Sequence, residues 1–333
     1  MFTSDLISAR GLARSFKTRK GRVEAVRPLN FDVAAGEIVG LLGPNGAGKT
    51  TTLRMLTTLL EPSSGSARVV GHDLSRDPRA VRRGIGYVAQ VGSAPAAGTL
   101  LGEELITQAR LQGLSKPEAG RRLAEVAPRL DLAGLEGRSL MQLSGGQRRR
   151  FDIALGLMHA PRLVFLDEPT TGLDPQSRAN LWDHLRSLRD ETGVTILLTT
   201  HYLEEADALA DRILVMDDGR LIADDTPAAL KARVAGDVIA LGFERGVERA
   251  VQVTRQTLEP RAIKVTERAL QITVEEGAVA VAPLLRALDA AGLQPSSVTV
   301  SRPSLDDVFL TLTGRSLREE TTAPPAVPEP TYA

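Results

Sequence analysis

At residues 38–50 the chain reads Ile38-Val39-Gly40-Leu41-Leu42-Gly43-Pro44-Asn45-Gly46-Ala47-Gly48-Lys49-Thr50. Its first five residues form an apolar run typical of a buried strand, and a helical pattern follows Thr50. Between them, Gly43, Gly48, Lys49 and Thr50 take the fixed places of the pattern G-x-x-x-x-G-K-[ST], whose glycines let successive backbone N–H groups surround phosphate oxygens. The sequence therefore predicts a strand, a phosphate-binding loop and a helix whose N-terminal end faces the phosphates.

The phosphate loop predicts a nucleotide site with bound Mg²⁺. We expect Lys49 to reach the β- and γ-phosphates and the Thr50 hydroxyl to ligate the metal. Two strand patterns at 7–16 and 23–33 precede the loop and predict a hairpin near the nucleotide base. Phe16 is a candidate to stack on adenine and Val26 to line the same pocket, although an ordinary core aromatic explains Phe16 equally well. The predicted nucleotide-binding residues are Phe16, Val26, Gly43, Pro44, Asn45, Gly46, Ala47, Gly48, Lys49, Thr50 and Thr51.

The composition of the chain argues against binding to nucleic acid or to membrane lipids. Lys and Arg total 41, as do Asp and Glu, and aromatic residues make up 3% of the 333 residues. Zero net charge and few aromatics argue against binding to nucleic acid or to an anionic membrane. There is no cysteine, and neither a signal peptide nor a membrane-spanning apolar run is visible. We therefore expect a soluble, cytoplasmic protein.

Two carboxylates follow the apolar run 163–166. Strand alternation predicts that Asp167 and Glu168 point to opposite sides, so that they can have different roles. Asp167 can hold Mg²⁺, and Glu168 can act as the general base that polarises the attacking water. His201 follows another strand pattern at 194–199. A lone histidine is usually structural, but at the end of a parallel strand it could reach a γ-phosphate.

Helical patterns occupy residues of about 92–142, between two strands of the expected α/β core. Ser115 and Glu118 predict a capping box within this helical insertion. A small, flexible loop at 92–98 precedes it, directly after a strand pattern that ends at Gln90. A further helix opens at 143–147 with Leu143, Ser144, Gly145, Gly146 and Gln147. The three arginines that follow, 148–150, read as a solvated face or as a helix start that faces phosphate.

These motifs, in this order and at these separations, resemble the ATP-binding subunit of an ABC transporter over residues of about 5–225. The motifs are the phosphate loop, Gln90, the stretch 143–147, the pair Asp167 and Glu168, Asp174 and His201. The phosphate loop alone would also admit GTPases and kinases. The stretch Leu143-Ser144-Gly145-Gly146-Gln147 separates this family from them. The resemblance implies a P-loop ATPase core with an antiparallel β-subdomain and a helical insertion.

The resemblance also implies partners and roles. Two chains, either identical or related, would pair head to tail and sandwich two MgATP, with Ser144 and Gly146 in the stretch 143–147 of one chain contacting the γ-phosphate bound by Lys49 of the other. Asp174 would lie at this interface and His201 would bridge to the γ-phosphate. Gln90 would ligate Mg²⁺ and pass motion to the flexible loop and helical insertion behind it. The insertion would drive an integral membrane permease, which would hold the protein at the inner face of the cell membrane. The featureless loop 92–98 departs from the bulkier residues expected at such a contact.

The C-terminal portion changes in pattern after Pro227. Alternating strand and helix patterns predict the order β-α-β-β-α-β, a ferredoxin-like α+β domain at 235–315. A proline-rich tail at 319–333 is expected to be disordered. The ending Leu305-Asp306-Asp307-Val308-Phe309-Leu310 resembles ATP-binding proteins of the daunorubicin-resistance type, which energise drug or natural-product export. An equal alternative is that this domain only stabilises a dimer.

Two other functions remain open. A non-transport ATPase acting on ribosomes or nucleic acid would use the same nucleotide sandwich, but one nucleotide module, zero net charge and the lack of long heptad repeats speak against it. The motor of an importer is the second alternative, and export is favoured over it only by analogy. The sequence does not reveal the transported molecule, since the substrate pathway would belong to the permease.

Overall fold

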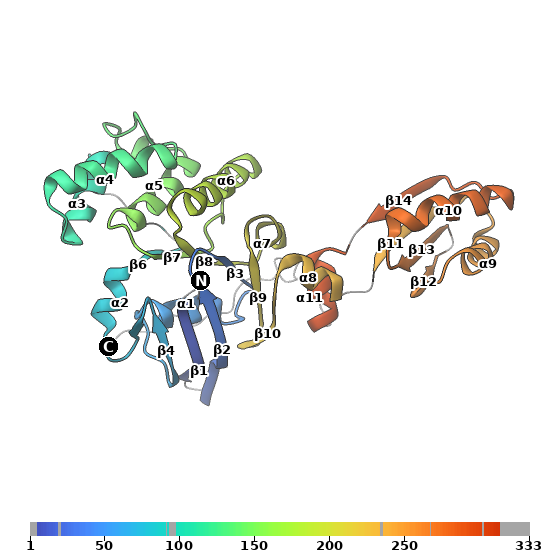
Figure 1. Cartoon of the computed structure of the whole chain (residues 1–333), viewed down its shortest axis with the longest axis horizontal. Helices are drawn as coiled ribbons and strands as arrows, with labels where there is room; N and C mark the ends of the chain where they lie inside the picture. The colour runs from blue at the N-terminus through green and yellow to red at the C-terminus, as the bar shows by residue number, and fades with distance from the viewer. Residues whose placement is uncertain are drawn as a thin grey trace. The chain divides into compact units, whose positions relative to one another are not determined.

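The computed structural model describes residues 5–18, 21–90, 92, 98–233, 236–266, 268–301 and 303–313. They form two compact units that join between Thr226 and Pro227 (Figure 1). Each unit is described by itself.

The first unit is built on a six-stranded sheet with the order β10-β9-β3-β8-β7-β6. Five neighbouring strands are parallel, and β10 pairs antiparallel with β9 at one edge. Strands β3, β7 and β8 are buried throughout, because layers of structure cover both faces of the sheet. The bounds are β3 (Ile38–Leu42), β6 (Ile85–Val88), β7 (Leu163–Asp167), β8 (Thr195–Thr200), β9 (Arg212–Asp217) and β10 (Arg220–Asp225).

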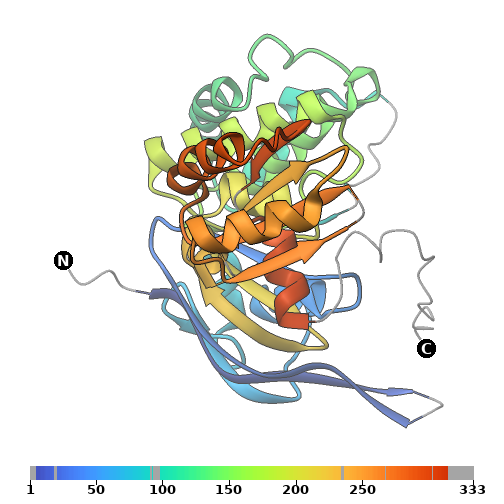
Figure 2. The same cartoon turned by 90° about the vertical axis from the view of Figure 1, so that its right-hand side faces the viewer.

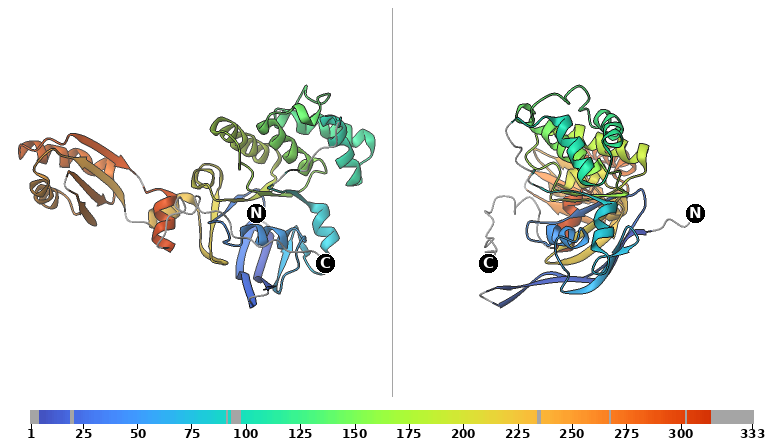
Figure 3. Two further views of the ribbon diagram at one scale, coloured as in Figure 1. Left: turned by 180° about the vertical axis from the view of Figure 1, so that it is seen from behind. Right: turned by 90° about the vertical axis from the view of Figure 1, so that its left-hand side faces the viewer.

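An antiparallel sheet of order β2-β1-β4-β5 covers one face of the central sheet (blue in Figures 1 and 3). Its strands are β1 (Asp5–Thr18), β2 (Gly21–Ala34), β4 (Ser64–Val69) and β5 (His72–Asp73). Strands β1 and β2 form the predicted hairpin, whose turn residues 19–20 lie outside the described residues. Leu12 of this sheet, Leu53 of helix α1 (Lys49–Leu56) and Phe165 of β7 belong to one hydrophobic core.

Helices cover the opposite face of the central sheet (green in Figure 1). Ser115 caps α4 with the predicted capping box, in which its backbone N–H donates to Glu118 Oε2 at 2.8 Å. Phe151 of α5, Leu185 of α6 and Leu198 of β8 lie in the second core, which this layer shares with the sheet. The bounds are α3 (Leu101–Leu111), α4 (Lys116–Arg129), the 3-10 turn η1 (Leu140–Gln142), α5 (Gly145–Leu157), α6 (Pro175–Thr192) and α7 (Leu203–Leu209). Helix α2 (Pro78–Gly84) instead packs in the first core through Val81.

The second unit contains the predicted β-α-β-β-α-β order. Its sheet has the order β12-β13-β11-β14 with every neighbouring pair antiparallel, which is the ferredoxin-like arrangement (orange in Figure 2). Helices α9 and α10 pack on one face of this sheet, while α8 and α11 pack against each other. The bounds are α8 (Pro227–Arg233), β11 (Asp237–Gly242), α9 (Val247–Thr257), β12 (Ala262–Val265), β13 (Ala269–Val274), α10 (Gly277–Ala290), β14 (Ser297–Ser301) and α11 (Leu305–Thr313).

The expected fold class is confirmed, with one strand shorter than predicted. Strand β6 ends at Val88, so Gln90 belongs to the following loop. The proline-rich tail and most of the loop 92–98 lie outside the described residues, and no prediction about their order is tested. Within the described ranges, every helix is too short or too polar to span a bilayer.

Candidate active site

The phosphate loop connects β3 to α1 in the predicted way, and its glycines are required by close packing. Gly48 has φ of 100°, and a Cβ at that position would lie 2.6 Å from the carbonyl oxygen of Ala25. A Cβ on Gly43 would collide with the carbonyl oxygen of Met216. Only glycine avoids both contacts, because it has no side chain, and at Gly48 the positive φ also favours glycine.

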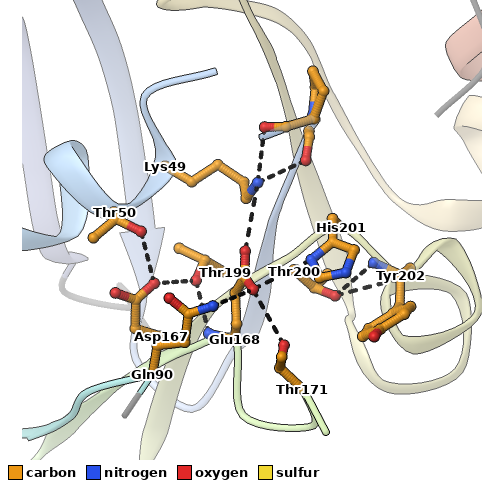
Figure 4. Close-up of polar contacts among 12 residues, drawn as sticks. Lys49, Thr50, Gln90, Asp167, Glu168, Thr171, Thr199, Thr200, His201 and Tyr202 are labelled. Carbon is orange, nitrogen blue, oxygen red and sulfur yellow. Dashed lines mark hydrogen bonds and ion pairs between the residues drawn. The ribbon is translucent and has the colours of Figure 1, made fainter. Parts of the chain in front are cut away.

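Lys49 is the buried cation of this loop. Its Nζ donates to the carbonyl oxygens of Gly43 at 2.7 Å and Pro44 at 2.9 Å, and it lies 3.8 Å from Glu168 Oε1 (Figure 4). The Lys49 side chain is only 5% exposed. A charge buried to this degree needs such partners, and phosphate oxygens would be stronger ones than carbonyls.

Asp167 connects the loop to the neighbouring strand. Its Oδ1 accepts from the Thr50 hydroxyl at 3.1 Å and from the Thr199 hydroxyl at 2.7 Å. Thr199 Oγ1 also accepts from the backbone N–H of Glu168 at 2.9 Å. These contacts bring hydroxyl and carboxylate oxygens together at the ends of β7 and β8, beside the start of α1 (Figure 4).

Glu168 lies at the centre of a set of polar side chains. Its Oε2 accepts from Gln90 Nε2 at 2.9 Å and from the Thr171 hydroxyl at 3.1 Å, and His201 Nδ1 lies 3.3 Å away (Figure 4). Burial raises the pKa of Glu168, but His201, Lys49 and Thr171 together outweigh burial, so that this pKa lies below its ordinary value. The carboxylate is therefore ionised at neutral pH and can accept a hydrogen bond or a proton from water.

The prediction that Asp167 and Glu168 point to opposite sides is wrong. Glu168 lies beyond the end of β7, and its φ of 44° is in the left-handed region, so the alternation of the strand stops at Asp167. Both carboxylates face the phosphate loop, where Asp167 contacts Thr50 and Glu168 lies near Lys49. They nevertheless have separate partners.

Arg149 is buried, which corrects the interpretation of residues 148–150 as a solvated face. Its side chain comes from α5 and donates to four carbonyl oxygens, those of Pro169 at 2.7 Å, Ala89 at 2.8 Å, Asp167 at 3.1 Å and Glu168 at 3.4 Å. Burial lowers the pKa of Arg149. The guanidinium thus joins the start of the Gln90 loop to the backbone on either side of Glu168.

A second buried group was not anticipated from the sequence. Glu205 of α7 is 0% exposed and accepts from Trp182 Nε1 at 3.2 Å. Burial raises the pKa of Glu205 and outweighs the neighbouring polar groups of Thr200, Thr170 and Trp182, which lower it. Thr170 follows Glu168 by two residues and Thr200 directly precedes His201. The pair Glu204-Glu205 looks like ordinary solvated acids in a helix start, so only the tertiary fold distinguishes Glu205.

The remaining predicted residues have local roles in the structure. Phe16 is 36% exposed and stacks with the guanidinium of Arg14 at 4.8 Å, whereas Val26 is 1% exposed beside Gly48. Asp174 caps α6, since its Oδ1 accepts from the backbone N–H of Ser177 at 2.9 Å. Whether these residues meet adenine or a second chain stays a prediction.

Residues 143–147 form the exposed start of α5. Ser144 and Gln147 make a capping box, with the Ser144 N–H donating to Gln147 Oε1 at 3.0 Å and the Gln147 N–H donating to Ser144 Oγ at 3.2 Å. Ser144 and Gly145 are exposed to solvent. This helix start is therefore shaped by its own hydrogen bonds and is open to a ligand or partner.

Comparisons with known proteins show the family of the chain. The model of the family described as ABC transporter matches residues 26–171. The daunorubicin resistance ATP-binding protein DrrA3 of Streptomyces coeruleorubidus is 44% identical over 302 residues, which cover 90% of this chain and 94% of that protein. The Nod factor export ATP-binding protein I of Paraburkholderia xenovorans (strain LB400) is 39% identical over 310 residues, covering 91% and 96% of the two chains.

A solved structure is also similar. That of cbiO1 from Clostridium perfringens, part of the ABC transporter complex cbiONQ, has a TM-score of 0.61. It is 28% identical and the match covers 68% of this chain and 91% of that chain.

Proposed function

The chain belongs to the ABC transporter family, in which it is an ATP-binding and ATP-hydrolysing subunit, and we propose that it drives an exporter through a separate membrane permease. The observation that carries the proposal is Glu168, an ionised carboxylate held by Gln90 and Thr171 within 3.8 Å of Lys49. Relatives named for drug resistance and for Nod factor export support the export direction.

In the proposed reaction, water attacks the γ-phosphorus of ATP and the bond to the bridging oxygen of ADP breaks. Glu168 orients this water and accepts its proton, while Lys49 compensates negative charge on the phosphates. His201, beside Glu168, would contact the γ-phosphate as well. Entry of the phosphates would replace the carbonyl partners that Lys49 has in the structure.

Mg²⁺ fits the oxygen atoms that surround the loop. The hydroxyl of Thr50 and the carboxylate of Asp167 are within 3.1 Å of each other, and such hard oxygen donors suit this ion. The Gln90 side-chain oxygen would be a third donor, since its amide nitrogen is directed to Glu168. Bound there, the ion would neutralise phosphate charge.

The proposed active form is a head-to-tail dimer, formed with a second copy or a related chain. Each chain has one phosphate loop, and the start of α5 is exposed at Ser144 and Gly145, where the N-terminal end of a helix favours an anionic phosphate. We assign the γ-phosphate contact of residues 143–147 to the ATP of the opposite chain. Asp174 would lie at the same interface.

This assignment predicts that ATP binding and dimerisation can be separated. Glu168→Gln with MgATP should accumulate as a dimer, because hydrolysis no longer releases the pair. Adding Ser144→Arg should abolish that dimer and leave ATP affinity unchanged, since Ser144 serves the other chain's nucleotide. Sedimentation velocity and a nucleotide titration measure the two effects. Ser187→Arg, at an exposed position on α6, is the control and should leave both unchanged.

If Ser144→Arg weakens ATP binding by the monomer as strongly as it weakens dimerisation, residues 143–147 act within their own chain. The head-to-tail arrangement would then be wrong.

We place the permease contact at a groove of about 510 Å³ that is lined by Ala89, next to Gln90, by Glu104 and Gln108 of α3 and by Asp152 of α5. The hydrogen bond from Gln90 to Glu168 gives this groove a direct connection to the proposed base. A segment of a membrane protein seated here would contact the core sheet and the helical layer at once. The protein would thereby be peripheral to the membrane.

Capture from membranes of the native host distinguishes the transporter from the alternatives. Tagged Glu168→Gln protein with MgATP should retain a hydrophobic, multi-spanning protein, and Gln108→Glu together with Glu104→Lys should reduce the yield without changing ATP affinity. Ribosomal proteins or nucleic acid in place of a membrane protein would favour the non-transport ATPase. The substrates of the captured permease would separate exporter from importer.

A further inference from the structure

Strand β14 (Ser297–Ser301) is an unprotected edge of the second unit's sheet. All five of its residues are exposed, and the strand carries no charge and no proline. The opposite edge strand, β12, carries Lys264 within the strand. Charged residues are a common means of preventing edge-to-edge pairing, so one edge of this sheet is protected and the other is not.

The sequence of this edge is symmetric about Thr299. Reading outward, Val298 matches Val300, Ser297 matches Ser301, and Pro295 matches Pro303 four residues on either side. Only the positions of Ser296 and Arg302 break the symmetry. An antiparallel strand that is symmetric in this way is complementary to its own copy, because each residue then meets its like across the pair. The two prolines, which donate no backbone hydrogen bond, limit such a pairing to the residues between them.

The register of the sheet shows which side chains the pairing would bury. Val298 is opposite Leu241 and Val300 is opposite Ile239 in β11, whose side chains are buried under the helices. The two valines are therefore on the helix-covered face, yet they are 41% and 38% exposed, because no strand of the described residues pairs with the outer edge of β14. A second copy would place Val300 beside Val298 at this edge and extend the core across the pair.

We infer that β14 pairs antiparallel with β14 of a second copy about a two-fold axis through Thr299, joining two four-stranded sheets into one. The contact is isologous, since the same segment serves both copies. It buries few residues, so the dimer is weak and forms without nucleotide. It is separate from the head-to-tail dimer proposed for the first unit and does not depend on it.

A cysteine at the axis tests this directly, because the chain has none of its own. Directly opposed residues of antiparallel strands have Cα atoms about 4.5–5.5 Å apart, within the span of a disulfide. Thr299→Cys at about 0.1 mM protein, under mild oxidation and without nucleotide, should therefore form a covalent dimer readily. Ser297→Cys is the matched control on the same strand and face. Its copy would lie about 13 Å away along the pair, so it should cross-link at least tenfold more slowly.

If the Thr299→Cys and Ser297→Cys variants cross-linked at equal rates, the disulfides would arise from random collisions, and the proposal would be overturned. A Thr299→Cys chain that stays monomeric would also overturn it, since the edge would then be free or covered by the chain itself. As an independent measurement, Val298→Lys with Val300→Lys places like charges opposite each other and should remove self-association in nucleotide-free sedimentation. Its ATPase activity and circular dichroism should match those of the wild type, and self-association that persists in this variant contradicts the pairing.

Discussion

Lys49 and Glu168 face each other across the phosphate site, with Nζ 3.8 Å from Oε1 and with 5% and 8% of the two side chains exposed. Each group stabilises the charged form of the other in a poorly solvated place. The lysine and the carboxylate therefore form one electrostatic unit into which ATP phosphates must enter.

Lys49→Ala should weaken ATP binding at least about tenfold, because a buried cation no longer faces the phosphates. A fluorescence titration with a nucleotide analogue measures this. Lys116→Ala, at the exposed start of α4, serves as the control and should bind normally. Unchanged affinity in the Lys49 variant would contradict its role in the phosphate loop.

Glu168→Gln should lower ATP turnover by a factor of about 10²–10⁴ while MgATP binding is retained, since the amide keeps the shape of the side chain but cannot accept a proton. Phosphate release under saturating ATP measures the rate. Hydrolysis at the wild-type rate would show that another group serves as the base.

Arg149→Met should lower the free energy of unfolding of the first unit by about 3 kcal/mol or more, because four carbonyl oxygens lose a charged donor. The midpoint of thermal unfolding should fall by about 6–12 °C. Arg110→Met, on an exposed position of α3, should shift it by no more than a degree or two. A similar small shift for Arg149→Met would show that the buried contacts contribute little.

Glu205→Gln should become more stabilising, relative to the wild type, as the pH rises. The pKa of Glu205 is raised above 4.5 in the folded protein, so its contribution to stability is complete below that pH and is lost as the pH rises through the folded-state value. The difference in unfolding midpoint between the variant and the wild type should therefore grow as the pH rises from 4.5 through the folded-state pKa of Glu205. The exposed neighbour variant Glu204→Gln should show no such trend.

Local sequence signals predicted much of the fold. The apolar run before Gly43, the cap at Ser115, the helix start at 143–147 and the strand-helix alternation after Pro227 each depend on neighbours within a few residues, and the structure contains all of them. Such signals can be read without knowing the tertiary fold.

Tertiary contacts determine the features of the site that the sequence did not predict. Three consecutive arginines look equivalent, and only the packing of α5 against the ends of β6 and β7 makes Arg149 the buried one. Glu205 is similar, because Trp182, which binds it, is 23 residues away. The positive φ of Glu168 depends on the turn after β7, so alternation along the strand gave the wrong direction for its side chain.

The position of Arg149 in α5 also bears on when ATP hydrolysis can begin. Ser144 caps the start of α5, and Arg149, further along the same helix, binds the carbonyl groups of Ala89 and Glu168. A second chain that engages Ser144 would thus act on the same helix that positions the base. We expect the nucleotide on an isolated chain to have a long lifetime, with hydrolysis starting only after assembly. The helix would then prevent ATP hydrolysis by a chain that has no partner.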